Sequence, residues 1–540
     1  MLRSVPFALA IAGLSASLAA AQPASQEAAP ASPPAATPPP PRAAVETVEI
    51  AAIVAPDLFS VSGGETGLAP TLWRGSSPEI AKEVIPTLGA RPLSPPGLAL
   101  ARRLMATGAI GPDGAGNDPD LAGARAAALL AAGDPAGAAS LLERTAIVSD
   151  SPALSRAAAD AALTLGQPDR ACLAADALKT ARDQPYWLRL RAYCLAHANK
   201  TAEAQLAFRL ATPAATTPTD AYARLMEARM VEGAPAGEAS ARSPIELALS
   251  RDLNLDLAPA IATATPAALR VLAIDPAAGP AVNLAAGRAA LRQGLITGEA
   301  ARAADPEAAL EFSARPGPTF TSQTVATRLS RAKGPAEFTA TARLLAEGIA
   351  KLPPKELAPE TRITLASAAA AAGDLPTARE IRDAIERTVD APALDLALLD
   401  ALLAAAAGQA DTPVIDHLLE RSGIGDARAR ARAAGGAALL IALADPKAEA
   451  LGGRDRAELS RLDIGAIQAP AARLMAMDLA ADSGLAGETG LLALSVAASG
   501  GAAGPRLADR IAIVRALARA GLRQDAAAFA VEGILELQGR

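Results

Sequence analysis

Residues 133–138 read GDPAGA, residues 166–171 read GQPDRA, residues 199–204 read NKTAEA, and residues 373–378 read GDLPTA. Each segment begins with glycine or asparagine and has alanine five positions later. A proline follows nineteen positions after the first residue in each case, at Pro152, Pro185, Pro218 and Pro392. The first three segments are spaced 33 positions apart. A fixed period of this length is typical of stacked helical hairpins and predicts an all-α protein.

Each recurring position of this pattern has a physical role in a helical hairpin. Glycine or asparagine tolerates the left-handed conformation that ends the first helix. Alanine lets the second helix approach the first closely, and proline ends the unit and begins the next. The expected hairpins span residues 121–142, 153–181 and 187–210, with a fourth unit at 221–241 that carries Gly233. Ala520-Gly521-Leu522-Arg523, followed by Ala526, predicts a last hairpin.

The spacing resembles that of the tetratricopeptide repeat. The alanine of the crossing is followed four positions later by a larger apolar residue, as in Ala138 with Leu142 and Ala204 with Phe208. Seven positions before each turn stands a small residue, which is Ala126, Ala159, Ala192 or Ala366. The resemblance implies an α-solenoid of antiparallel helical hairpins, a fold that presents binding surfaces. The whole chain is also similar to alanine-rich secreted helical proteins of alphaproteobacteria whose role is unassigned.

Composition divides the chain into six segments. From about 250 to 350 the period is lost and prolines predict short helices, so one continuous solenoid and two separate stacks both remain open. Residues 45–50, which read VETVEI, predict one short strand. The expected segments are a signal peptide at 1–21, a Pro/Ala-rich linker at 22–45, a mixed segment at 46–118, repeats at 119–250, irregular short helices at 251–350, and C-terminal helical repeats at 351–540.

The N-terminus has the three parts of a secretory signal. Arg3 supplies the positive start, residues 7–19 are uncharged and apolar, and Ala19-Ala20-Ala21 offers small residues to a signal peptidase. The apolar run is too short to span a bilayer, and no later stretch is a transmembrane candidate. We therefore expect a periplasmic or secreted protein that begins at Gln22.

The charge and composition exclude several kinds of partner. Lys plus Arg is 51 and Asp plus Glu is 57, for a net charge of −6, and aromatic residues make up 2% of the chain. A protein that binds nucleic acid needs a basic surface, and often stacking aromatics, so nucleic acid is not an expected partner. Scarce aromatics also argue against a sugar-binding cleft.

No motif for catalysis stands out. The two histidines, His197 and His417, are far apart in sequence, whereas a zinc site needs three or four clustered ligands. The segments Gly64-Glu65-Thr66-Gly67 and Gly487-Glu488-Thr489-Gly490 lack the lysine of a phosphate loop and are interpreted as turns. We expect no catalytic residue, no metal site, no cofactor and no enzymatic activity.

The chain has two cysteines, Cys172 and Cys194. An even number in an exported protein favours a disulfide. Each lies eleven residues from Asp183, near the turn between two helices, so an antiparallel hairpin sets the two side by side. The alternative is a pair of buried free thiols.

Five of the 12 aromatic residues fall in one short stretch. They are Tyr186, Trp187, Tyr193, Phe208 and Tyr222. They could fill a local core, or they could form a surface that binds a partner, since aromatic residues dominate interface anchors. We name residues 186–222 as the candidate partner surface.

The sequence thus favours an exported, non-enzymatic scaffold that binds a protein or peptide of the cell envelope through a helical-repeat surface. The alternative is a structural envelope component that assembles with itself or contacts peptidoglycan. Enzymatic activity is the third and least favoured interpretation.

Overall fold

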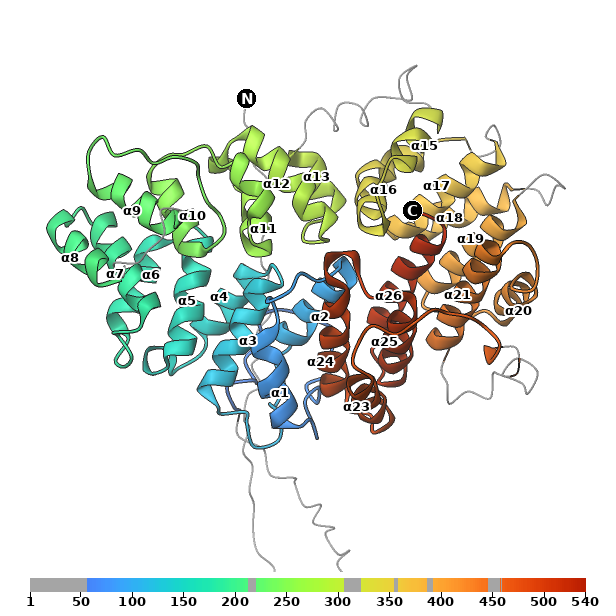
Figure 1. Ribbon diagram of the computed structural model, residues 1–540, viewed down its shortest axis with the longest axis horizontal. Coiled ribbons are helices and arrows are strands. Elements are labelled where there is room, and N and C mark those ends of the chain that lie inside the picture. Colours follow the sequence, from blue (N-terminus) through green and yellow to red (C-terminus); the bar gives the residue numbers. More distant parts are fainter. Residues whose placement is uncertain are drawn as a thin grey trace, which may run out of the picture. The chain divides into compact units, whose positions relative to one another are not determined.

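The protein is entirely helical wherever the structure describes it (Figure 1). The computed structural model describes residues 56–211, 220–304, 322–353, 358–385, 392–444, 457 and 459–540. This part contains 24 α-helices, several short 3-10 turns and no β-strand. The expected all-α class is therefore confirmed. The predicted signal peptide, linker and strand at 45–50 lie outside the described residues.

Two helices precede the repeats, α1 (Pro78–Val84) and α2 (Pro95–Ala106). Ser77 caps α1, because its Oγ accepts a hydrogen bond from the N–H of Ile80 (3.2 Å). Proline occupies the first position of both helices, where its missing N–H has no helical partner to lose. Half of the α-helices in the described part of the chain begin with proline in the same way.

The predicted repeats form three consecutive hairpins. Their helices are α3 (Pro119–Ala131) with α4 (Pro135–Glu143), α5 (Pro152–Thr164) with α6 (Pro168–Ala177), and α7 (Pro185–His197) with α8 (Thr201–Ala211). Each helix packs against the next along the chain. Pro152 and Pro185 stand at the first position of α5 and α7, whereas Pro218 lies outside the described residues.

The turn residues and the small residues of the pattern have the predicted geometry. The turns are left-handed at Gly133 (φ 86°), Gly166 (φ 73°), Asn199 (φ 59°) and Gly373 (φ 90°). The crossing alanines and the small residues of the first helices are all completely buried: Ala138, Ala171, Ala204, Ala378, Ala126, Ala159, Ala192 and Ala366. A larger side chain at these places would force the helices apart.

The expected fourth hairpin does not form within residues 221–241. Helix α9 (Ala221–Met230) ends before Gly233, which is left-handed (φ 81°), but residues 231–243 form turns and extended chain. The missing alanine and proline explain this, since nothing starts or closes a second helix. The partner of α9 is instead α10 (Pro244–Asp252).

Helices α10 and α11 (Pro266–Ile274) lie against the first helices of the repeats (Figure 1). Helix α10 contacts α5 and α7, and α11 contacts α3 and α5. Arg251 of α10 donates to the carbonyls of Leu163 (3.2 Å) and Thr164 (3.1 Å) at the end of α5. The face that the first helices would offer a partner is thus largely occupied by the chain itself.

The middle region, 251–350, contains helices as long as those of the repeats. They are α11, α12 (Pro280–Arg292), α13 (Gly298–Ala304), α15 (Ser322–Ser330) and α16 (Pro335–Ile349). Helices α12 and α16 have 13 and 15 residues, so the frequent prolines start helices here and do not only shorten them.

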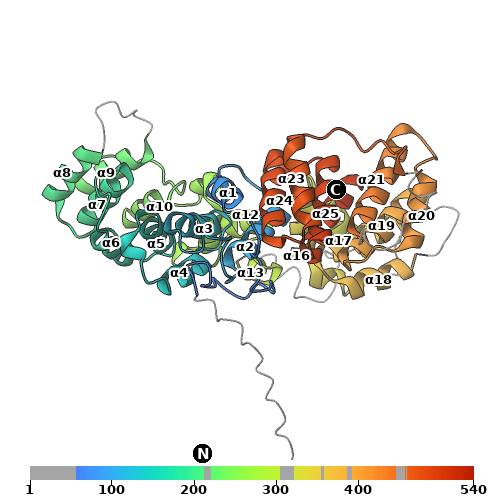
Figure 2. The same ribbon diagram turned by 90° about the horizontal axis from the view of Figure 1, so that it is seen from below.

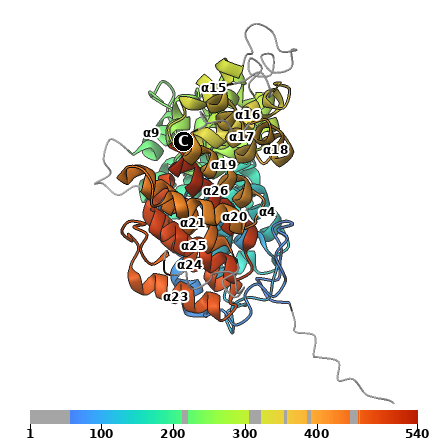
Figure 3. The same cartoon turned by 90° about the vertical axis from the view of Figure 1, so that its right-hand side faces the viewer.

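Helical hairpins return in the C-terminal region. Its helices are α17 (Pro359–Ala372), α18 (Leu375–Asp383), α19 (Ala393–Ala406), α20 (Thr412–Arg421), α21 (Ala427–Leu443), α23 (Ala471–Asp482), α24 (Ala486–Ala497), α25 (Leu507–Arg519) and α26 (Arg523–Leu537). Helix α26 contacts α16, α19, α21 and α25, as Figure 3 allows the reader to follow. The predicted last hairpin is α25 and α26, with Gly521 left-handed at its turn (φ 83°).

Helices α1 and α2 pack against both the repeats and the C-terminal helices (Figure 2). Helix α2 contacts α3 on one side and α24 and α26 on the other, and α1 contacts α24. Polar contacts join these distant segments: Glu488 Oε2 accepts from the N–H of Ser77 (2.7 Å), and Arg103 forms an ion pair with Asp525. Residues 56–106 are therefore part of the core and link the first helices of the chain to the last.

Candidate functional site

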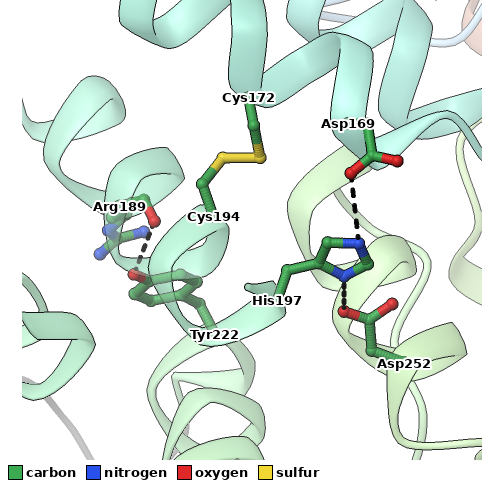
Figure 4. The surroundings of a disulfide bond; sticks show 7 residues. All are labelled: Asp169, Cys172, Arg189, Cys194, His197, Tyr222 and Asp252. Atoms are coloured by element: carbon green, nitrogen blue, oxygen red, sulfur yellow. Dashed lines mark hydrogen bonds and ion pairs between the residues drawn. A yellow bond between two sulfur atoms is a disulfide. The ribbon is translucent and has the colours of Figure 1, made fainter. Parts of the chain in front are cut away.

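The predicted cysteine pair joins α6 to α7 (Figure 4). The sulfurs of Cys172 and Cys194 lie at disulfide distance, and their Cα atoms are 5.6 Å apart. This is the arrangement that the antiparallel register predicts. The first helix of the third repeat is thereby fixed to the second helix of the repeat before it.

His197 lies one turn after Cys194 and connects three helices (Figure 4). Its Nδ1 is 2.7 Å from Asp252 Oδ2 of α10, and its Nε2 is 3.8 Å from Asp169 Oδ1 of α6. These contacts hold α10 against the repeat that carries the disulfide. His417 is on α20 and takes no part in this arrangement.

Three of the five aromatic side chains in the candidate partner surface are buried. Trp187, Tyr193 and Tyr222 are at most 2% exposed and belong to one apolar core with residues of α5, α9 and α10. Tyr222 also donates from its Oη to the carbonyl of Arg189 (3.0 Å). Tyr186 and Phe208 are half-buried at the edge of the same core. These aromatics form the local core that was the alternative interpretation, and the three buried rings offer a partner no surface.

At the edge of this core, Tyr186 makes a contact that has a pH-dependent consequence. Its Oη donates to Asp160 Oδ1 (2.7 Å), and the Arg156 guanidinium lies 4.5 Å from the centre of the Tyr186 ring. Burial raises the pKa of Asp160 to about 6, although the hydrogen bond from Tyr186 and the charge of Arg156 act to lower it. At neutral pH the fold therefore holds a half-buried carboxylate, whose Oδ2 also lies 3.7 Å from Arg156 Nε.

We predict that Asp160→Asn raises the free energy of unfolding at pH 7 by about 1 kcal/mol, because the amide keeps an acceptor for Tyr186 without a buried charge. A carboxyl whose folded pKa is raised costs stability above that pKa and regains it as the pH falls and the group becomes protonated. The advantage of the variant in melting temperature is therefore expected at pH 7, should shrink as the pH falls through about 6, and should vanish only below about pH 4, where the carboxyl is protonated in the unfolded chain as well. A difference independent of pH would contradict the prediction. Asp183→Asn, at an exposed position of the same repeat, is the control.

Two large apolar side chains of residues 186–222 are exposed, and the sequence did not single them out. Leu206 and Leu210 lie one helical turn apart on α8 and are 61% and 66% exposed. Leu173, on α6 of the preceding repeat, is 68% exposed. Their position in the repeat could have indicated this exposure. They lie on the second helix of a repeat, which packs against the first helix through its alanine and leaves its opposite face exposed to solvent.

The described side chains contain no group of three or more histidines, cysteines and carboxylates close enough to hold a metal ion. In the same part of the chain, no helix combines the length and apolar character needed to cross a bilayer. Comparison with protein-family models, curated proteins and solved structures finds no match to this chain.

Proposed function

We propose that this protein is an exported scaffold, without enzymatic activity, that binds a protein or peptide of the cell envelope through the second helices of its repeats. The observation that carries the proposal is the exposure of Leu206 and Leu210 on α8. Large apolar side chains that stay in water on a rigid helix are typical of interaction surfaces. The tetratricopeptide-like spacing and the secretory signal support the same proposal.

The packing of the chain favours the second helices over the first as the binding surface. Helices α10 and α11 already cover α3, α5 and α7, so a groove along the first helices is not free. The disulfide between α6 and α7 and the bridge through His197 hold the third repeat in place. A surface that is already ordered loses little conformational entropy when a partner binds.

We predict that the double substitution Leu206→Gln and Leu210→Gln abolishes capture of the partner and leaves the melting temperature unchanged. Both side chains are exposed, so their replacement costs no core packing, while a docking surface loses its apolar contacts. The experiment captures partners from envelope extract with the mature protein and identifies them by mass spectrometry. The mass of protein recovered from that fraction also reports whether residues 1–21 have been removed.

A matched control is available on α23, where Met475 and Leu479 are also one turn apart and are 65% and 62% exposed. Met475→Gln with Leu479→Gln should keep capture. Equal capture by both double variants would rule out α8 as the docking surface. If the protein captures only copies of itself, and the α8 variant does not, the result would favour the alternative of a structural envelope component.

A further inference from the structure

Two adjoining cavities meet at one arginine, Arg343 of α16. The first, of about 510 Å³, lies among α2, α12, α16, α17 and α26, and the second, of about 640 Å³, lies among α11, α13, α16 and the turn after α12. Gly294, Arg343 and Ala372 line both. Each cavity has the size of a typical site for a small organic molecule.

Arg343 lacks the acidic partner that Arg302 and Arg270, two other arginines at these cavities, both have. Arg302 pairs with Glu347 (2.9 Å), and Arg270 pairs with Asp134 (3.0 Å). The guanidinium of Arg343 makes no hydrogen bond or ion pair with any residue that the structure describes. Burial lowers the pKa of Arg343, which is the response of a cation that has lost water and gained no counter-charge.

A second guanidinium adds to the positive charge beside Arg343. Arg102 of α2 donates to two carbonyls, Ala132 O and Gly294 O (both 2.9 Å), and to no carboxylate of the described chain. Burial, and then the charges of Arg270 and Arg343, lower its pKa to about 10. A Cβ on Gly294 would stand 3.7 Å from Arg343 Nη1, so Gly294 separates the two guanidinium groups.

The charge of Asp134 acts on Arg102 and opposes the lowering of its pKa, but the carboxylates that line the two cavities form no pair with Arg343. Glu532 lines the first cavity, but it accepts from Ser94 Oγ (3.1 Å) and Arg510 Nη2 (3.3 Å). Glu299, at the second cavity, is exposed to solvent. An anion that enters from outside would therefore find Arg343 free to donate two hydrogen bonds.

The remaining wall of the first cavity is largely apolar. It includes Leu291, Ala371, Leu375, Val531 and Leu535. An apolar group placed here would leave water, whereas a fully polar ligand would lose hydration without compensation. The cavity thus favours a molecule with a charged end and an apolar body.

We propose that Arg343 binds the carboxylate or phosphate group of a small organic anion whose apolar part occupies the cavity between α2, α16, α17 and α26. The charged group would form a bidentate pair with the guanidinium, and the positive charge of Arg102 would strengthen its binding from the far side of Gly294. This site is separate from the surface of α8, so its test does not depend on the proposed scaffold function.

The test uses octanoate, octyl phosphate and the neutral octanol as probes, with the full-length mature protein in calorimetric titrations. We expect one or both anions to bind at least about tenfold more tightly than octanol, because only they pair with a guanidinium. The tighter of the two anions identifies the preferred head group. Equal binding of anions and octanol, or no binding of either anion, would overturn the proposal.

Arg343→Gln should weaken binding of the anions about tenfold or more and leave octanol unaffected. Without any probe, its melting temperature should equal or exceed that of the wild type, because an unpaired, half-buried charge contributes no stabilising contact to the fold. The control is Arg209→Gln, which removes the same charge from an exposed position on α8 outside both cavities. Unchanged anion affinity, or a clear fall in melting temperature without the probe, would assign Arg343 a structural role instead.

Discussion

Replacement of Arg125 by methionine is expected to lower the free energy of unfolding by about 4 kcal/mol, since hydrogen bonds of a charged donor are lost and buried carbonyls are left unpaired. Arg125 belongs to α3 and is completely buried. It donates hydrogen bonds to five backbone carbonyls, those of Met105 (2.8 Å), Thr107 (2.8 Å), Val61 (2.9 Å), Phe59 (3.0 Å) and Leu58 (3.5 Å). Its guanidinium also lies 5.0 Å from the centre of the Phe59 ring.

These five carbonyls belong to residues 58–61 and to the end of α2 at 105–107, and among them Phe59 O also accepts from the N–H of Ala109 (3.1 Å). Arg125 supplies these buried carbonyls with hydrogen-bond donors, which backbone N–H groups supply in a helix or a sheet. Methionine fills a similar volume but supplies none. The effect is expected to exceed that of an ordinary surface substitution by several fold.

Thermal and urea unfolding, followed by circular dichroism, measure the loss. Arg125→Lys keeps the charge but cannot reach five carbonyls from one ammonium group, so an intermediate loss of about 2 kcal/mol is expected. Arg170→Met is the control, because the exposed pair between Arg170 and Glu143 contributes at most about 1 kcal/mol. Equal stability of the Arg125→Met and Arg170→Met proteins would show that the buried network does not hold the two segments.

The local pattern of the repeats could be predicted from the sequence because its causes are local. A left-handed residue at Gly133 or Asn199 and a small residue at Ala138 or Ala204 act within one hairpin. Such signals lie close together in the chain, and each has a single structural solution. The register of Cys172 and Cys194 follows from the same local geometry.

Contacts between distant segments could not be predicted, and Gly487 and Gly490 show why. Glycines in the sequence GETG predicted a turn, but both residues lie in α24. A Cβ on Gly487 would stand 2.4 Å from the Trp73 ring, and one on Gly490 would stand 2.6 Å from Leu104 Cδ1. These glycines allow close packing against residues more than 380 positions away, and tertiary contact overrides the local preference.

The candidate sites were hidden for a related reason. Charged residues are mostly exposed and apolar ones mostly buried, so a sequence offers no sign that Arg125 is buried and Arg343 half-buried while Leu206 is exposed. The aromatic cluster was visible, yet its burial depends on α9 and α10, which fold over the repeats from a region without the repeat pattern.

Loss of the disulfide is the second large effect that we expect. Cys172 and Cys194 are separated by 22 positions, and a closed loop of this length lowers the entropy of the unfolded chain by an amount equivalent to about 3 kcal/mol. The double substitution Cys172→Ala and Cys194→Ala should therefore lower the free energy of unfolding by about 3 kcal/mol. Because both cysteines are only partly buried, little of this loss should come from packing.

Comparison of the oxidised protein, the reduced protein and the double alanine variant separates the bond from the side chains. If the bond stabilises by restricting the unfolded chain, reduction and double substitution should lower stability equally. A loss in the variant but not on reduction would point to packing of the two thiols, the alternative to a bond. Peptide mapping without reductant, on protein from the envelope fraction, completes the test, since two alkylatable thiols in the folded protein would contradict the bond.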